Sequence, residues 1–340
     1  MVNQPFTAIQ MIGTQRSGSN LLRLMLNQLE SVSAPHPPHI LERFVPLLTA
    51  YGNLNEQARF SELAADVCKL IEYNPVPWDG LELNNNEIIS RCNKNSIEEI
   101  FRVVYEMRAQ SQNARIWICK SMVNIQFVDL LEADIKPLYL HLYRDGRDVA
   151  LSFMKAIVGE KHVYFIAKQW REEQEAAVRL MDNIDSGRFI KVRYENLLTN
   201  PESEIKSLCT FIGAEYDPSV LSFFQSNESI NTAHSGEMWK NVEKPILKNN
   251  FNKFSREMSA SDIQLFEQVA GETLLKLGYP LQFPADNRPF TQEQIQEFSA
   301  INEQRKNEVR AAINPEDLLK RKTQDDLLKS IRSRMPVSGN

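Results

Sequence analysis

The chain has 340 residues, of which 42% are hydrophobic and 24% charged, a composition typical of a soluble globular protein with a large core. Its formal charge of −5 argues against a general nucleic-acid-binding surface, which would be strongly basic. No segment is apolar over the length of a membrane span, no secretory signal opens the sequence, and the four cysteines show no paired spacing. We therefore expect a cytoplasmic protein in a reducing compartment, without a stable membrane span.

The first predicted strand, residues 9–12, ends in a polar loop that leads directly into a helix. The loop covers residues 13–20, and apolar residues then recur at helical spacing from Leu21. Backbone N–H groups at the start of a helix, together with the guanidinium of Arg16, form a binding site for a phosphate-like anion. A tight turn alone would explain the glycines and serines but not Arg16. Further donors are expected from Ser17, Gly18, Ser19 and Asn20.

The loop fits the pattern Gly-x-x-x-x-Gly, but it lacks the lysine of nucleotide triphosphatases. Ser19-Asn20 stands where those proteins have Lys-Ser or Lys-Thr. A triphosphate with its Mg²⁺ would be poorly held without that lysine. Arg16 can instead bind a single phosphate through two parallel hydrogen bonds.

The next strands expected along the chain are residues 115–119, 138–143 and 189–193. Each is short and apolar, and each is followed by a helical pattern, which indicates an α/β domain with a parallel sheet. The segment 40–114 is mostly helical in pattern and much longer than a simple crossover, so we interpret it as a helical lid.

Polar residues follow the strand at 138–143. Arg144 comes directly after this strand, and Ser152 lies about two turns along the next helix, from where its hydroxyl can approach the same place. Asp145 and Asp148 are expected to cap that helix, and Arg147 is expected to be a solvated charge.

After residue 285 the sequence becomes charged, with only weak apolar spacing. We divide the chain into a domain over residues 1–285 and a helical C-terminal extension over residues 286–340, which we expect to be peripheral.

Taken together, these segments resemble the sulfotransferase superfamily over roughly residues 6–280. The loop resembles the family's 5′-phosphosulfate loop, in the Arg-Ser-Gly form of tyrosylprotein and bacterial carbohydrate sulfotransferases. Arg144 and Ser152, eight positions apart, resemble its 3′-phosphate motif. Tyr194 matches the Tyr of the family's Tyr-Glu-x-Leu segment, and Lys253 lies in a segment similar to its C-terminal nucleotide-closing segment.

The resemblance implies a sulfotransferase-type fold: a P-loop-like parallel sheet flanked by helices, with a helical lid and acceptor region at residues 40–114. It also implies 3′-phosphoadenosine-5′-phosphosulfate (PAPS) as donor and an acceptor hydroxyl as its partner. A sulfuryl group carries less charge than a phosphoryl group, so no metal is expected. Arg16 would hold the 5′-phosphate. Lys120 matches the family lysine after the second strand and would stabilise the leaving oxygen.

The general base is assigned by resemblance to two histidines. Cytosolic members have a His two residues after the lysine, where this chain has Met122. The segment 34–40 resembles the Glu-Pro-Gln-Glu of the bacterial trehalose sulfotransferase, with His at both carboxylate positions. His39 then matches the base, His36 is the reserve and Glu42 a third choice, although both histidines could simply brace a proline-rich turn.

Two other functions stay open from the sequence. A PAP- or PAPS-binding sensor without catalysis would keep the donor site and lose the base. A P-loop kinase would need ATP and Mg²⁺, and the missing lysine argues against it. The acceptor could be a small molecule, sugar, lipid or peptide, nucleic acid is not expected as a partner, and a homo-oligomer is possible.

Overall fold

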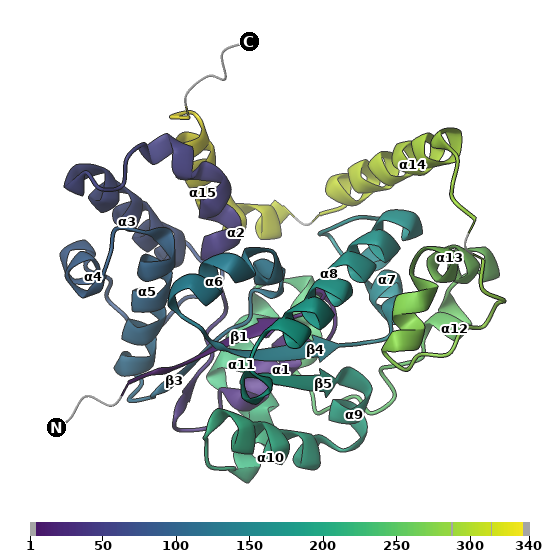
Figure 1. Ribbon diagram of the computed structural model, residues 1–340, viewed down its shortest axis with the longest axis horizontal. Helices are drawn as coiled ribbons and strands as arrows, with labels where there is room; N and C mark the ends of the chain where they lie inside the picture. The colour runs from purple at the N-terminus through teal and green to yellow at the C-terminus, as the bar shows by residue number, and fades with distance from the viewer. Residues whose placement is uncertain (1–4, 287, 314, 336–340) are drawn as a thin grey trace.

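The computed structural model describes residues 5–335, except 287 and 314, and is built around a five-stranded sheet (Figure 1). Its strands pair in parallel in the order β2-β3-β1-β4-β5. The strands are β1 (Thr7–Ile12), β2 (Val32–Ser33), β3 (Ile116–Cys119), β4 (Leu138–Tyr143) and β5 (Phe189–Arg193). The α/β class and four of the five strands are therefore confirmed. The fifth, β2, has only two residues at the edge of the sheet, too few to show a period.

Fifteen α-helices and five 3-10 helices are described in the chain outside residues 1–4, 287, 314 and 336–340. The α-helices are α1 (Ser19–Leu26), α2 (Ile40–Phe44), α3 (Gln57–Glu72), α4 (Asn85–Arg91), α5 (Ile97–Ser111), α6 (Val128–Asp134), α7 (Gly146–Lys155), α8 (Val163–Asn183), α9 (Tyr194–Thr199), α10 (Pro201–Ile212), α11 (Asn227–His234), α12 (Phe254–Glu257), α13 (Ala260–Lys276), α14 (Gln292–Ala311) and α15 (Pro315–Arg332). The 3-10 helices are η1 (Val45–Tyr51), η2 (Met122–Phe127), η3 (Ser186–Arg188), η4 (Pro218–Gln225) and η5 (Glu237–Glu243).

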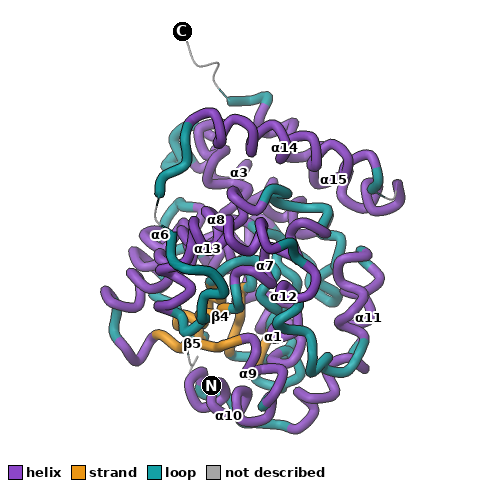
Figure 2. The backbone as a smooth tube through the Cα atoms, turned by 90° about the vertical axis from the view of Figure 1, so that its right-hand side faces the viewer, coloured by secondary structure: helices purple, strands orange, loops and turns teal. Residues whose placement is uncertain are grey.

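Helices cover both faces of the sheet because its strands are apolar on both sides. On β3, Trp117 and Cys119 pack into one core with α3 and α5, whereas Ile116 and Ile118 pack into a second core with α1, α9 and α10. A third core joins α7, α8 and α13. In Figure 2 the strands lie enclosed among helices, with α14 and α15 on the side away from α10.

The order of the strands creates a crevice between β1 and β4. The chain leaves β1 toward β2 on one side, and it leaves β4 toward β5 on the other. At such a switch point the two following loops diverge, which opens space at the carboxyl ends of the strands. The loop 13–18 and Arg144 lie at this place.

The segment 40–114 and the C-terminal extension both pack against the rest of the protein through buried residues. Residues 40–114 cover one face of the sheet and share a core with Trp117 and Tyr139. In the C-terminal extension, most residues of α14 and α15 are exposed or half-buried, and Asn302, Gln324 and Ile331 are buried where these peripheral helices contact the rest of the protein. None of the helices in the described ranges is long and apolar enough to cross a membrane.

Candidate active site

A cavity of about 860 Å³ opens at the carboxyl ends of the strands. The loop after β1, Lys120 after β3, Arg144 after β4 and Tyr194 after β5 all contribute to its lining. It brings together most of the residues predicted from the sequence: Arg16, Gly18, Ser19, Asn20, His36, His39, Lys120, Arg144, Ser152, Tyr194 and Lys253. Ser17 is the exception, because it is fully buried behind the lining.

The loop after β1 is held in a conformation that depends on two glycines. A Cβ at Gly13 would lie 2.3 Å from the carbonyl oxygen of Leu142, and one at Gly18 would lie 2.3 Å from the ring of Tyr194. Both glycines have positive φ angles, and so does Arg16 between them, at 70°. A positive φ is strained for a residue with a side chain, and such strain is commonly kept at functional sites.

Two arginines from different strand ends meet in this cavity. Arg16 donates from Nε to the hydroxyl of Ser152 at 3.1 Å. The guanidinium of Arg144 donates to the carbonyl oxygens of Arg16 (3.2 Å) and Asn250 (3.0 Å) and lies 4.5 Å from the ring centroid of Tyr194. Burial, followed by the nearby charge of Arg144, lowers the pKa of Arg16. Two cations held this close favour the binding of an anion between them.

Several buried polar atoms here lack a protein partner within the described part of the chain. They are Nε of Arg144, Oγ of Ser17 and Oδ1 of Asn20. Leaving such atoms unpaired is costly, and an oxyanion would satisfy the guanidinium. The residues present therefore fit an oxyanion such as a phosphate group.

Asp148 does not cap α7, contrary to the expectation from the sequence. Its buried carboxylate accepts hydrogen bonds from the backbone N–H groups of Asn252 (2.7 Å), Lys253 (2.8 Å) and Phe254 (2.9 Å). It also forms an ion pair with Arg144 at 3.5 Å. Asp148 thus fastens the segment that carries Lys253 to the side of α7.

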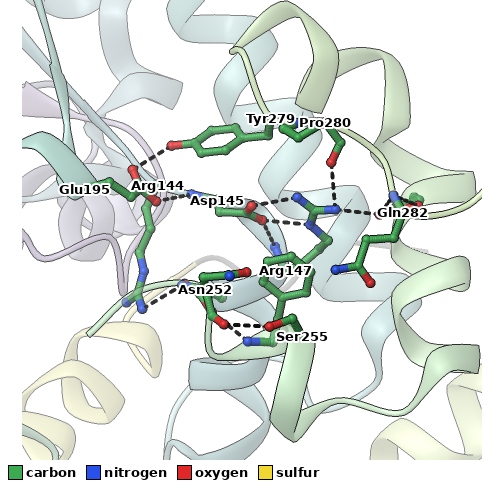
Figure 3. Close-up of polar contacts among 12 residues, drawn as sticks. Arg144, Asp145, Arg147, Glu195, Asn252, Ser255, Tyr279, Pro280 and Gln282 are labelled. Carbon is green, nitrogen blue, oxygen red and sulfur yellow. Dashed lines mark hydrogen bonds and ion pairs between the residues drawn. The ribbon is translucent and has the colours of Figure 1, made fainter. Parts of the chain in front are cut away.

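Arg147 is also not solvated, because only 2% of its surface is exposed. Figure 3 shows its guanidinium beside Asp145 and the carbonyl oxygen of Pro280. It forms a second ion pair with Glu267 at 2.6 Å. Asp145 does cap α7, as expected, by accepting from the backbone N–H of Arg147. This network fixes the start of α7, directly after Arg144.

Lys120 is a buried cation in the cavity wall. Burial, together with the positive charges of Arg23 and Arg16, lowers the pKa of Lys120 to about 7. An ammonium in such surroundings gains strongly from an anion bound beside it.

The two histidines have different surroundings. His39 has a φ of 59°, and its Nδ1 lies 3.1 Å from both the Ser121 hydroxyl and the Glu42 carboxylate. Burial lowers the pKa of His39, so its neutral form is favoured. His36 is buried against the edge of Trp239, with ring centroids 4.9 Å apart, and its pKa lies well below the usual value because of burial and of Lys120. Neither ring nitrogen of His36 has a hydrogen-bond partner among the residues described.

Several lining residues were missed from the sequence. They are Arg43, Glu173 and Arg321, on α2, α8 and α15. Burial raises the pKa of Glu173 to about 7, and its side chain accepts a hydrogen bond from Gln169. A carboxylate on the otherwise apolar side of a helix was a weak signal for Glu173. No local pattern marks Arg43 or Arg321 as a lining residue.

Comparisons with known proteins agree with this geometry. A family model described as "Sulfotransferase family" matches residues 8–218. Protein-tyrosine sulfotransferase A of Caenorhabditis elegans is 24% identical over 275 residues, which cover 78% of this chain and 66% of that relative.

Among solved structures, the sulfotransferase domain from the Synechococcus PCC 7002 olefin synthase is similar with a TM-score of 0.51 and 18% identity, over 79% of this chain and 96% of that domain. The sulfotransferase domain from the curacin biosynthetic pathway gives a TM-score of 0.48 at 18% identity, over 88% of this chain and 97% of that domain. The first of these shows a shared fold.

Proposed function

Because the chain belongs to the sulfotransferase family, we propose that it transfers a sulfuryl group from PAPS to an acceptor hydroxyl and releases adenosine 3′,5′-bisphosphate (PAP). The observation that carries this proposal is the convergence of Arg16, Arg144 and Ser152 in one cavity with unpaired polar atoms. Arg16 and the N–H groups at the start of α1 would hold the 5′-phosphate. Arg144 and Ser152 would hold the 3′-phosphate, and Tyr194, Asn250 and Lys253 complete the donor end.

In the proposed reaction the acceptor oxygen attacks sulfur in line with the leaving phosphate oxygen. A new S–O bond forms, the bridging S–O bond breaks, and the acceptor's proton passes to a base. Lys120 and Arg16 would stabilise the negative charge that develops on the bridging oxygen. No metal is needed for that step, since the sulfuryl group is less charged than a phosphoryl group.

We assign the base to His39 rather than His36. The Glu42 carboxylate accepts only, so the pairing at 3.1 Å requires a proton on Nδ1 of His39 and leaves Nε2 as the acceptor. Glu42 then stabilises the imidazolium that forms, in the manner of a carboxylate–histidine pair. His36 makes no such contact.

Donor binding is tested by calorimetric titration of PAP in EDTA. The wild-type protein is expected to bind PAP without added metal, and Arg144→Ala is expected to weaken binding by at least about tenfold while acceptor preference stays the same. Absence of PAP binding, or a strict requirement for ATP and Mg²⁺, contradicts the proposal and favours a P-loop kinase.

The base assignment is tested by sulfuryl transfer from labelled PAPS. Phenols are the first acceptors to try, because the relative in C. elegans is named for tyrosine. His39→Ala should lower turnover about 10²–10⁴-fold with unchanged PAP affinity. Unchanged turnover in a variant lacking both His36 and His39 removes the assignment. Tight PAP binding by the wild-type protein, without transfer to any acceptor, identifies a sensor. Cytoplasmic location and self-association stay predictions.

A further inference from the structure

Helix α14 of the C-terminal extension contacts the segment that joins α7 to α8, and part of this segment forms one wall of the cavity. Its residues 156–159 line the cavity. They are Ala156, Ile157, Val158 and Gly159, so the wall offers an apolar surface and no charged side chain. The segment has irregular backbone, and its shape therefore depends on side chains that bind its carbonyl and N–H groups.

Lys161 provides the first of these contacts from within the segment. Its side chain is only 2% exposed, and its ammonium donates to the carbonyl oxygens of Phe153 (3.2 Å), Val158 (2.7 Å) and Gly159 (2.9 Å). The ammonium thus holds two carbonyl groups of the wall, those of Val158 and Gly159, close to one carbonyl group near the end of α7.

Asn302 on α14 provides the second contact. Its Oδ1 accepts from the backbone N–H groups of Lys161 (2.8 Å) and His162 (2.9 Å), and its Nδ2 donates to the carboxylate of Glu160. Its side chain therefore meets three consecutive residues, and only 4% of Asn302 is exposed. Lys306, one turn further along α14, pairs with Glu160 at 2.7 Å. The ring of Phe298 stacks on His162 with centroids 4.6 Å apart.

The extension reaches the cavity at a second point as well. Arg321 on α15 lines it, 5.6 Å from the ring centroid of Trp239, which in turn contacts His36. The buried side chain of Gln324 fixes α15 by accepting from Arg43 (2.6 Å) and donating to the carbonyl oxygen of Leu70 (2.7 Å). All these residues of the extension lie beyond the family match, which ends at residue 218.

We propose that Asn302 is a positioning residue for the acceptor end of the cavity, where it holds the wall at residues 156–159 in place. This inference rests on the proposed function. The donor's phosphates need charged, hydroxyl and N–H groups, which the loop after β1, Arg144 after β4 and Ser152 on α7 offer. The apolar wall suits the body of an acceptor instead. Helix α14 is then part of the active site, although it lies outside the family match.

The experiment compares Asn302→Ala with the exposed control Asn307→Ala on the same helix. The probes are PAP and 4-nitrophenyl sulfate, which run the reaction in reverse. The 5′-phosphate oxygen of PAP attacks sulfur, the S–O bond of the ester breaks, and 4-nitrophenolate leaves. Asn302→Ala is expected to raise KM for 4-nitrophenyl sulfate by at least about fivefold and to leave the Kd for PAP within about twofold.

A second readout is independent of turnover. In hydrogen–deuterium exchange, the amides of Lys161 and His162 should exchange faster in Asn302→Ala than in the wild type or in Asn307→Ala. Asn302→Asp keeps the oxygen that accepts from both amides. It should therefore retain most of their protection and a KM close to that of the wild type. If Asn302→Ala does not fold, Asn302→Gln replaces it, because the longer side chain moves the accepting oxygen away from both amides.

Two results overturn the inference. One is an unchanged KM for 4-nitrophenyl sulfate despite faster exchange of both amides. The other is a loss of PAP affinity as large as the rise in KM, which would place the wall at the donor end. A wild-type protein that neither binds PAP nor releases 4-nitrophenol contradicts the proposed function first, and the inference falls with it.

Discussion

Lys120 is a buried residue whose protonation state depends on the other charges in the cavity. It lies in the wall with Arg16 and Arg23 as charged neighbours, and its pKa falls to about 7. Its protonated form is costly in the protein without a ligand and becomes favourable when an anion arrives. Binding of a nucleotide phosphate or sulfate should therefore be coupled to proton uptake by Lys120.

This coupling predicts that PAP binds more weakly as the pH rises. Above the pKa of about 7, Lys120 loses its charge, and affinity should fall by up to about tenfold per pH unit between pH 7 and 9. Phosphate groups, whose second pKa is about 6, no longer change charge in this range. Calorimetry of the wild type, Lys120→Met and the exposed control Lys276→Met measures the slope. The same slope in Lys120→Met would contradict the assignment.

Glu173 gives a prediction for stability, and its sign follows from the raised pKa. Burial raises the pKa of this carboxyl to about 7 in the folded protein, above its value in the unfolded chain, so the fold favours the protonated form. The contribution of Glu173 to the free energy of unfolding is then fully present at acid pH. It is lost as the pH rises toward and through 7. Glu173→Gln keeps the shape without the charge.

Glu173→Gln should therefore be more stable than the wild type at pH 8, by on the order of 2–3 kcal/mol, and similar to it near pH 4.5. Urea unfolding at both pH values measures this, with the more exposed Glu172→Gln as control. A Gln variant that is less stable than the wild type at pH 8 would show that the carboxylate is favoured in the fold.

At the scale of elements, the contact between α7 and residues 252–254 is expected to affect both the stability of the fold and the binding of the proposed donor. Asp148 holds three consecutive N–H groups of that segment and pairs with Arg144. One side chain therefore positions both Lys253 and Arg144. Loss of its carboxylate leaves three backbone N–H donors unpaired, of which that of Phe254 is buried, and it leaves the buried guanidinium of Arg144 without its anion.

We expect Asp148→Ala to lower the free energy of unfolding by at least about 2 kcal/mol and to weaken PAP binding about tenfold or more. Asp148→Asn keeps one accepting oxygen, so its free energy of unfolding and its PAP affinity should lie between those of the wild type and Asp148→Ala. Thermal unfolding and calorimetry give the two quantities, and the exposed Asp182→Asn is the control. A destabilised Asp148→Ala with unchanged PAP affinity would separate residues 252–254 from the donor site.

The elements that sequence could predict are those whose signal is local. The strands β1, β3, β4 and β5 are runs of four to six mostly apolar residues, and the loop that starts at Gly13 and Arg144 each follow a strand end directly. Arg147 is buried against Glu267, which lies 120 residues away in the sequence. The charged residues next to Arg147 in the sequence therefore led to the wrong prediction that its side chain is exposed to solvent. Arg321 and Asn302 reach the cavity only through the docking of α14 and α15. No spacing along the chain records that docking.

At the scale of the whole molecule, the cavity is assembled from segments that are distant in the sequence. The loops after the strands supply most of the proposed donor-binding residues, and the start of α2 supplies His39 and Glu42. In the C-terminal extension, α14 holds the segment that continues from the wall at residues 156–159. The net charge is −5, yet Arg16, Lys120 and Arg144 gather at one place. This concentration of positive charge favours a nucleotide with more than one anionic group.

The central claim is that this cavity moves sulfuryl groups to and from a 3′-phosphorylated adenosine nucleotide. Release of 4-nitrophenol from 4-nitrophenyl sulfate, followed in EDTA with PAP or with adenosine 5′-phosphate, tests it most directly. We predict release that saturates with PAP, that falls at least about tenfold with adenosine 5′-phosphate, and that is nearly lost in Lys120→Met. Equal release with both nucleotides, or none with PAP at any concentration, would contradict the account.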